Sequence, residues 1–442
     1  MTHRSKGVVQ YVLAGADQAV LSVVSLCAAV ALMKYGSKDQ FAHYAIAVSI
    51  SLLVLRVQNA LIVVPITVRL PAMHEDDHKA ILATAQGWQT NLALILAVVS
   101  TIGWKVTELS SLGANAGWGA SLGFGLMLGG ALLREYCRCV EYARFRVLRA
   151  LLIDGTYAIA TLTAIGWLSV AGRLTLSSTL LSLGVASVIA GIVGMPVPLK
   201  LPALKGGLQL AKFVKIVATV GDMGRQGGWT LAAEAPSWVQ AYAYVYLSVA
   251  LIGSAATADL AASRVAMVPM FFVLTAWPKI FVPQAVRNLQ SHGTRRLERL
   301  GRLNVGIAAV FAILYGLALL AMGNTSLRSL IPASYVGAFG SYTGLWAFCG
   351  LLLACRTVIW YLLIVVRDFK GLFIAASYGA IVTVVGSCFL IWYSGAAGAL
   401  YALSTGEALV LVVCAVRFRR ALAARAVLVD GAPGELLNVA SS

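Results

Sequence analysis

The feature that most constrains this chain is a series of apolar runs, each about 20 residues long, that repeats along the whole sequence. A run of this length crosses the hydrocarbon core of a bilayer as one α-helix. Bounded by charged or turn residues, the runs lie near 8–33, 41–65, 87–104, 117–134, 150–170, 174–196, 229–253, 262–284, 303–323, 340–366, 372–393 and 396–416. We therefore predict an all-α integral membrane protein with about 12 transmembrane helices.

The composition leaves little room for a large aqueous domain. Of the 442 residues, 60% are hydrophobic and only 12% are charged, about half the charged fraction of an ordinary soluble protein. The net charge of +17 would raise the question of nucleic acid in a soluble chain. Here most of the Lys and Arg residues fall in alternate connections between the runs, as the positive-inside rule requires. No nucleic-acid partner is expected.

The same charge pattern predicts the topology. The basic connections lie on the side of both chain ends, which places the N- and C-termini in the cytoplasm and favours an even number of spans. The expected location is the bacterial inner (cytoplasmic) membrane, with multiple passes.

A long central connection divides the sequence into two halves of six runs. We predict an N-terminal six-helix bundle at 1–200, a cytoplasmic linker at 201–228, a C-terminal six-helix bundle at 229–420 and a cytoplasmic tail at 421–442. A second long connection is expected at 285–302, and a charged break at 367–370 separates the tenth span from the eleventh. Two bundles with a central linker are typical of secondary transporters.

We single out six ionisable residues within the apolar runs, where such side chains usually face a cavity or a partner. They are Asp17, Arg56, Glu234, Arg264, Arg356 and Glu407. Gln58 and Asn59 are polar neighbours of Arg56 on the second span. We treat each of these residues as a candidate functional residue.

The arginines indicate an anionic ligand. Arg56 lies nine residues before Pro65, or about 14 Å along a helix, which is close to the bilayer midplane. A guanidinium binds phosphate bidentately and stays charged. We therefore assign Arg56, Arg356, Arg264, Gln58 and Asn59 to a substrate-binding cavity. An ion pair between Arg56 and Asp17 is an alternative, and Arg264 is close enough to its helix end to reach the interface instead.

The acids allow a different role. Asp17, Glu407 and Glu234 are candidates for coupling transport to a proton or sodium gradient, or for ion pairs and hydrogen bonds between helices. No cofactor is expected.

The segment 133–149 repeats cations on a helix that continues out of the fourth run. Arg134, Arg138 and Arg144 either set the topology or form a pocket for a lipid head group.

Motifs of soluble enzymes are missing from the sequence. There is no Walker A motif for ATP and no Gly-x-Ser-x-Gly motif for acyl transfer. The Cys and His spacings complete no metal site. A transporter is favoured over an enzyme. An integral-membrane glycan polymerase or acyltransferase remains an alternative, although such enzymes usually carry a large periplasmic loop and every outer loop here is short.

Three stretches carry a resemblance to a known family: 58–68, 133–149 together with Asp154, and 227–231 followed by 255–264. Through them the chain resembles the polysaccharide-exporter (Wzx-type flippase) branch of the multidrug/oligosaccharidyl-lipid/polysaccharide superfamily. The resemblance implies a MATE-like V of two bundles around a cavity that opens alternately to either side. It implies a substrate of oligosaccharide on undecaprenyl pyrophosphate, with membrane lipids, a polysaccharide polymerase and export machinery as partners. The drug-exporting relatives carry acidic cation sites in the first bundle, so Asp17 leaves open a cation-coupled exporter of small amphiphiles.

Overall fold

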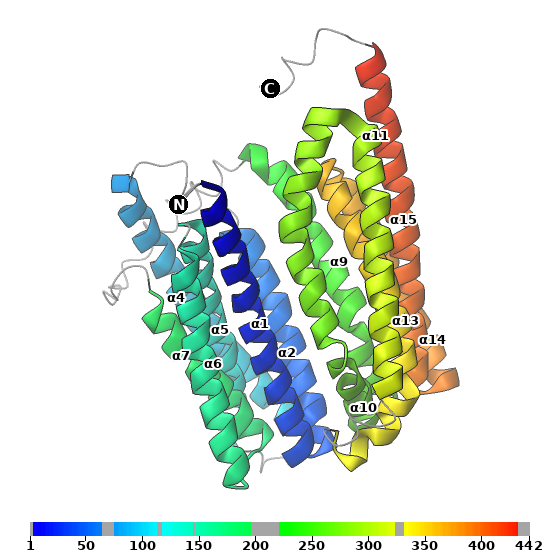
Figure 1. Ribbon diagram of the computed structural model, residues 1–442. Helices are drawn as coiled ribbons and strands as arrows, with labels where there is room; N and C mark the ends of the chain where they lie inside the picture. The colour runs from blue at the N-terminus through cyan, green and yellow to red at the C-terminus, as the bar shows by residue number, and fades with distance from the viewer. Residues whose placement is uncertain are drawn as a thin grey trace. The chain divides into compact units, whose positions relative to one another are not determined.

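A computed structural model of the chain describes residues 3–63, 75–112, 117–144, 146–195, 221–322 and 331–431. In these ranges the regular structure is entirely helical. Figure 1 shows the helices as long, roughly parallel rods within each part of the chain. The helices are α1 (His3–Tyr35), α2 (Lys38–Gln58), α4 (Glu75–Leu112), α5 (Gly119–Ala143), α6 (Val147–Val170), α7 (Leu176–Val193), α9 (Gly221–Ile252), α10 (Ser254–Val265), α11 (Val268–Met322), α13 (Val336–Val365), α14 (Phe369–Ser394) and α15 (Ala396–Gly431). A π-helical segment, η1 (Asn59–Val63), continues α2, and a 3-10 turn, η3 (Ala333–Tyr335), precedes α13.

Within the described ranges, nine helices are long and apolar enough to cross a membrane, or ten if a broken pair of helices is counted as one span. The chain is therefore a multi-pass membrane protein. Each of the twelve predicted spans falls on a helix. Helices α5 and α9, which correspond to the fourth and seventh predicted spans, are not among the helices that are long and apolar enough to cross a membrane. A count of exactly twelve spans and the side on which the termini lie stay predictions.

The helix boundaries depart from the predicted spans around the eighth and ninth. The eighth span was expected to begin at 262, but α10 already begins at Ser254, after a turn at Gly253 with φ +88°. The broken span then passes from α10 into α11. The connection expected at 285–302 is helical, because α11 consists of two helices joined at Gly293, where φ is 73°. A positive φ of this kind is accessible to glycine without steric cost, so Gly293 makes a sharp turn without a loop.

The charged break between the tenth and eleventh spans lies where it was expected. Helix α13 ends at Val365 and α14 begins at Phe369. Asp368 caps α14, since its side chain accepts a hydrogen bond from the amide of Gly371.

The contacts divide the chain into two compact units. Unit 1 holds Met1–Leu231, with Ser254–Val265 and Ser329–Tyr335 added from later in the sequence, and unit 2 holds Ala232–Gly253, Ala266–Arg328 and Val336–Ser442. The predicted linker at 201–228 lies largely outside the described residues, and its last part forms the first turns of α9. The segment α10 is thus part of unit 1, although it lies between two helices of unit 2 in the sequence.

Glycines bring the helices of unit 1 into close contact. A Cβ atom placed on Gly184 of α7 would lie 2.7 Å from the backbone nitrogen of Met127 on α5, and one on Gly130 would lie 2.9 Å from the carbonyl oxygen of Gly184. The two backbones therefore touch, as is common for small residues in membrane helices.

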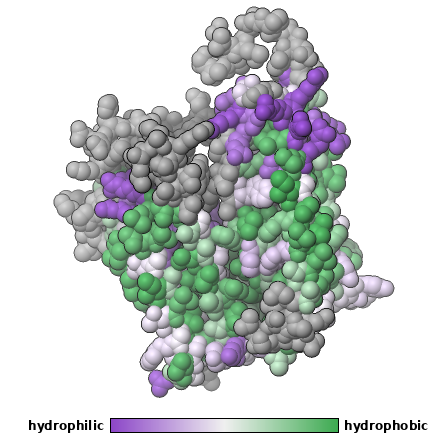
Figure 2. Space-filling model, in the orientation of Figure 1, coloured by the Kyte–Doolittle hydropathy of each residue, from purple (hydrophilic) through white to green (hydrophobic). Residues whose placement is uncertain are grey.

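In unit 2, cations gather at one end. Arg425 near the end of α15 donates to the carbonyl of Val366, beside the α13–α14 break, at 3.1 Å. Figure 2 shows hydrophilic residues over the same end of this unit, above a predominantly hydrophobic surface. The basic residues at this end are Arg287, Arg295, Arg296, Arg299 and Arg302 of α11, Arg367 and Lys370 at the break, and Arg417, Arg419, Arg420 and Arg425 of α15.

Candidate functional site

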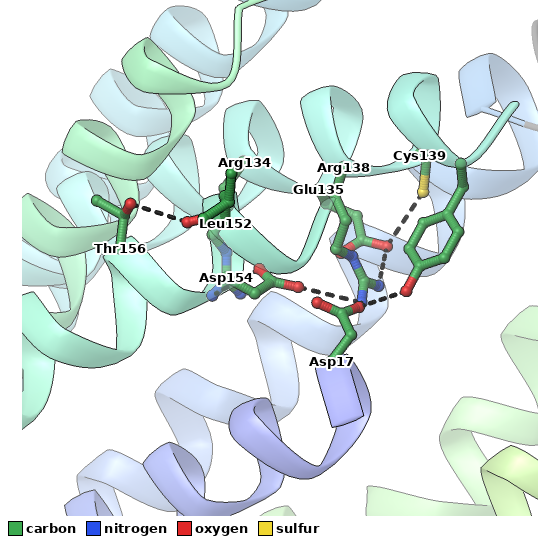
Figure 3. Close-up of polar contacts among 9 residues, drawn as sticks. Asp17, Arg134, Glu135, Arg138, Cys139, Leu152, Asp154 and Thr156 are labelled. Carbon is green, nitrogen blue, oxygen red and sulfur yellow. Dashed lines mark hydrogen bonds and ion pairs between the residues drawn. The ribbon is translucent and has the colours of Figure 1, made fainter. Parts of the chain in front are cut away.

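Helices α1, α5 and α6 of unit 1 enclose a network of ion pairs (Figure 3). At its centre, Nη1 of Arg138 lies 3.2 Å from Oδ2 of Asp17 and 3.4 Å from Oδ2 of Asp154. Nη2 of the same guanidinium lies 2.7 Å from Oε1 of Glu135. Asp17 and Asp154 are 1% and 0% exposed, so one arginine is shared by two fully buried carboxylates and a third nearby.

Helical spacing explains why α5 supplies several members of this network. Arg134, Arg138 and Tyr142 are four residues apart, which places them on one face of the helix. Asp154 lies about two turns into α6, and Asp17 faces the same region from α1 (Figure 3). Helix α5 ends at Ala143 and α6 begins at Val147, and the amide of Arg146 donates to the carbonyl of Glu141 at 2.9 Å.

Further contacts extend the network on both sides. Nη1 of Arg134 lies 3.7 Å from Oδ1 of Asp154, and the guanidinium carbon lies 3.7 Å from the centre of the Tyr157 ring, an arrangement typical of a cation–π contact. The hydroxyl of Tyr142 donates to Oδ2 of Asp17 at 2.6 Å. Cys139 donates to Oε1 of Glu135 at 3.4 Å.

Among the residues that the structure describes, the formal charges of this network do not balance. Asp17, Glu135 and Asp154 supply three carboxylates, whereas Arg134 and Arg138 supply two guanidiniums. Oδ1 of Asp17 accepts no hydrogen bond from the described part of the chain. An uncompensated buried charge is costly, so the network is suited to binding and releasing one proton.

Unit 2 contains a simpler buried pair. Nε of Arg356 on α13 lies 2.8 Å from Oε2 of Glu407 on α15, and the two side chains are 17% and 5% exposed. The ring centre of Trp360 lies 5.5 Å from the Arg356 guanidinium. The sequence singled out both charged residues, and the structure brings them together as one balanced ion pair.

The three predicted cavity residues at the end of α2, Arg56, Gln58 and Asn59, differ in how far they are exposed. Gln58 is buried, and its Nε2 donates to the carbonyl of Leu132 on α5 at 2.7 Å. Its amide therefore joins α2 to α5 in this conformation. Asn59 is exposed, and Arg56 is half-buried in the last turn of α2. Pro65, from which the depth of Arg56 was predicted, lies outside the described residues.

The remaining predicted residues lie on three helices. Arg264 is half-buried in the last turn of α10, some ten residues after that helix begins, so it is not at the start of a span as expected. Glu234 is half-buried on α9. Nη1 of Arg144 lies 3.5 Å from Oε1 of the buried Glu141.

The basic segment of α5 has a different environment from the one expected. Arg134 and Arg138 were predicted to set the topology or to bind a lipid head group. Their side chains are only 12% and 15% exposed, and both bind carboxylates of the protein. Asp17 is correspondingly paired with Arg138, whereas the sequence offered Arg56 as its partner.

Sequence reasoning missed several members of the two sites. Glu135, Tyr142, Tyr157 and Trp360 gave no signal of their own, since each is a common residue at a helix surface. Asp154 did give a signal, because it is an acid inside the fifth apolar run.

Among the described residues, no group of three or more His, Cys, Asp or Glu side chains is placed to hold a metal ion.

Comparison with known proteins gives a fold but no close relative. No family model matches the sequence, and no curated protein matches it. The lipid II flippase MurJ, in an inward closed conformation, is similar with a TM-score of 0.69 at 11% identity, over 93% of this chain and 87% of that one.

Two drug transporters are similar over comparable lengths. An inward-facing multidrug resistance MATE family transporter of the MOP superfamily has a TM-score of 0.66 at 14% identity, over 92% of this chain and 95% of that chain. A variant of the Vibrio cholerae MATE transporter VcmN has a TM-score of 0.62 at 13% identity, over 95% of this chain and 98% of that chain. The chain therefore has the fold shared by MurJ and the MATE transporters.

Proposed function

We propose that this protein is a flippase of the bacterial inner membrane. It translocates undecaprenyl-pyrophosphate-linked oligosaccharide repeat units to the periplasmic leaflet by alternating access, for export of exopolysaccharide or surface polysaccharide. A polysaccharide polymerase and export machinery are the expected partners. The fold supports this proposal, because one of the proteins that share it is a lipid II flippase.

The observation that carries the proposal is the burial of the membrane acids. Asp17, Asp154 and Glu407 are 1%, 0% and 4% exposed, and each lies against a guanidinium at 2.8–3.4 Å. These carboxylates are withdrawn from any ligand in this conformation. Of the six ionisable residues singled out within the apolar runs, the three outside these ion pairs, Arg56, Arg264 and Glu234, are half-buried, and two of the three are cations. That balance favours an anionic ligand such as a pyrophosphate.

A second candidate is a cation-coupled exporter of small amphiphiles. Two MATE transporters share the fold, and the unit 1 network has one carboxylate more than it has guanidiniums. The excess carboxylate suits a proton-coupling site equally well in a flippase and in an exporter. The identity of the transported molecule therefore separates the two candidates.

Reconstitution tests the flippase directly. Purified protein in proteoliposomes is given a fluorescent polyprenyl pyrophosphate that carries an oligosaccharide, and its movement between leaflets is measured. Arg56→Gln and Arg264→Gln are expected to slow the movement about tenfold, the effect of losing one charge-assisted contact. Arg302→Gln is the control, because that side chain is 76% exposed.

A deletion strain tests the same proposal in cells. Loss of surface polysaccharide, with lipid-linked repeat units accumulating inside, is the expected outcome. Normal polysaccharide together with increased sensitivity to amphiphilic drugs would overturn the flippase and favour the exporter.

A further inference from the structure

Two short segments belong to unit 1 by their contacts but lie among the helices of unit 2 in the sequence. Helix α10 lies between α9 and α11, and Tyr335 of η3 lies between α11 and α13. Both nonetheless pack in unit 1, where α10 contacts chiefly α2 and touches α1 and η3 as well. The chain therefore passes from unit 2 into unit 1 and back again at each of these two segments.

The contact centres on Lys38, the first residue of α2. Its Nζ lies 2.6 Å from Oδ1 of Asp259 on α10 and 5.2 Å from the ring centre of Tyr335. One ammonium therefore binds both segments, by an ion pair and by a cation–π contact. Tyr335 also packs edge-on against Phe41, one turn along α2, with ring centres 6.0 Å apart. Lys38 is thus the residue at which α2, α10 and η3 meet.

The first turn of α2 is held firmly in unit 1. Gly36, in the preceding turn, lies so close to α1 that a Cβ atom on it would lie 2.7 Å from the carbonyl oxygen of Leu32. Oε1 of Gln40 accepts a hydrogen bond from the amide of Leu176, at the start of α7, at 3.3 Å. Lys38 lies between these two anchors in the sequence. The two segments are therefore bound to a fixed part of unit 1.

Turns at both ends of α10 allow this helix to change direction independently of its neighbours. It follows Gly253, where φ is +88°, and the chain bends by 55° between α10 and the helix that comes next. Immediately after α10 the chain is held in unit 2, because the hydroxyl of Tyr315 donates to the carbonyl of Ala266 at 2.5 Å. A few residues at element ends, as here, are sufficient to absorb the motion of a hinge.

Two features suit this contact to repeated release. The side chains of Lys38 and Asp259 are 32% and 24% exposed, and an ion pair with this access to solvent is weak compared with a buried one. Tyr335 is 1% exposed, yet its hydroxyl forms no hydrogen bond with the described part of the chain. A hydroxyl of this kind opposes burial and regains hydrogen bonds to water when it is released. The closed contact is therefore partly offset by a destabilising group of its own.

We propose that α10 and Tyr335 form a latch that is closed on Lys38 in this conformation and opens once in each transport cycle. Opening frees both segments from unit 1, so that they move with the unit 2 helices to which they are joined. This inference rests on the alternating access of the proposed function, but it is independent of which molecule is transported.

Thiol labelling of the purified protein tests the latch. Ala258 of α10 is 0% exposed, so Ala258→Cys is expected to react with N-ethylmaleimide only when α10 leaves α2. Mass spectrometry reads the label at this residue. In this background, Lys38→Gln is expected to raise the labelling rate about tenfold, the combined effect of a partly exposed ion pair and a cation–π contact.

Three further variants sharpen the test. Asp259→Asn, which keeps the cation–π contact, is expected to raise the labelling rate less than Lys38→Gln. Tyr335→Phe is expected to lower the rate, because no hydroxyl is then left unpaired in the closed latch. Lys34→Gln is the matched control, since Lys34 is an exposed lysine on α1 that also lies over a tyrosine ring, at 5.5 Å.

The native cysteines distinguish opening of the latch from unfolding. Cys137 of unit 1 and Cys414 of unit 2 are both 0% exposed, and their labelling is expected to stay unchanged in every variant. A labelling rate at residue 258 that does not respond to Lys38→Gln would overturn the latch. So would a rise that is equally large at Cys137.

Transport in proteoliposomes gives a second measurement. Lys38→Glu places a carboxylate opposite Asp259, and it is expected to slow the movement of a fluorescent polyprenyl pyrophosphate that carries an oligosaccharide. Lys38→Glu together with Asp259→Lys is expected to restore both this movement and slow labelling. Full transport by Lys38→Glu, or no recovery in the double variant, would overturn the latch and leave the flippase standing. If the wild-type protein moves no probe, the flippase fails, and the labelling alone decides the latch.

Discussion

The two units bury charge in different ways. Unit 1 shares two guanidiniums among three carboxylates on three helices, whereas unit 2 has the Arg356–Glu407 pair on two helices. A carboxylate can take up a proton when its partner is lost, but an arginine stays charged at any ordinary pH. The network in unit 1 can therefore change its protonation and stay intact, while the pair in unit 2 is stable only as a pair.

The largest loss of stability is expected from a substitution that leaves a buried arginine without its carboxylate partner. Glu407→Ala leaves Arg356 in a site where the pair is only 17% and 5% exposed. We expect a loss of about 3–5 kcal/mol in the free energy of unfolding, the usual cost of removing one partner of a buried pair. Unfolding by SDS in bicelles measures it.

A double variant provides the control for this prediction. Arg356→Met together with Glu407→Gln removes both charges and keeps similar volumes, and such replacements are often close to neutral. We expect it to lie within about 1 kcal/mol of the wild type. A double variant as unstable as Glu407→Ala would show that packing, not the unpaired charge, sets the cost.

Removal of the central arginine of unit 1 should cost less and depend on pH. Arg138→Met leaves Asp17, Glu135 and Asp154 with Arg134 alone, and we expect a loss of about 2–3 kcal/mol near neutral pH. The crowded carboxylates of the folded variant bind protons more tightly than those of the unfolded chain. Its stability relative to wild type should therefore rise as the pH falls.

Unfolding at several pH values checks this second prediction. Glu407→Ala serves as the reference, because Arg356, left without its carboxylate partner, stays charged at both pH values. A loss in Arg138→Met that is the same at about pH 5 and about pH 8 would contradict the proposed difference between the units.

The fold could be read from the sequence to the level of membrane helices. Runs of about 20 apolar residues predict spans because the bilayer sets their length, and the charged break at 367–370 was located correctly. The helical turn at Gly293 was not predicted, since charged residues on a helix that leaves the membrane resemble a loop in hydropathy. The membership of α10 in unit 1 depends on long-range contacts such as the Lys38–Asp259 pair, at 2.6 Å, which carry no local signal.

The candidate sites were predicted as residues but not as partners. Asp17, Arg356 and Glu407 were singled out by the cost of charge in an apolar environment, whereas Arg138 was singled out in the basic segment 133–149. Their pairing was not, because it depends on the rotation and packing of α1, α5 and α6, or of α13 and α15. Glu135 and Tyr142 could be assigned to the network only from the structure, in which one face of α5 lies toward Asp17.

A smaller effect is expected from the hydrogen bond that Tyr142 donates to Asp17. Tyr142→Phe removes the 2.6 Å bond but keeps the ring, and we expect a loss of about 1–2 kcal/mol, as for other hydrogen bonds to charged groups. A double-mutant cycle with Asp17→Ala isolates the interaction. Tyr378→Phe is the control, because Tyr378 is 54% exposed on α14. An equal loss of stability in this control would contradict the contribution of the Tyr142–Asp17 hydrogen bond.

The smallest effect on stability should come from making unit 1 resemble unit 2. Asp154→Asn leaves two carboxylates and two guanidiniums, so the network becomes balanced at neutral pH. We expect the free energy of unfolding to stay within about 1 kcal/mol of the wild type, because the lost ion pairs are offset by removal of the excess charge. The informative change is in pH dependence. Between about pH 5 and about pH 8, proton uptake by the excess carboxylate should alter wild-type stability, and Asp154→Asn should flatten that dependence. A variant that keeps the wild-type pH profile would show that the excess proton resides elsewhere in the protein.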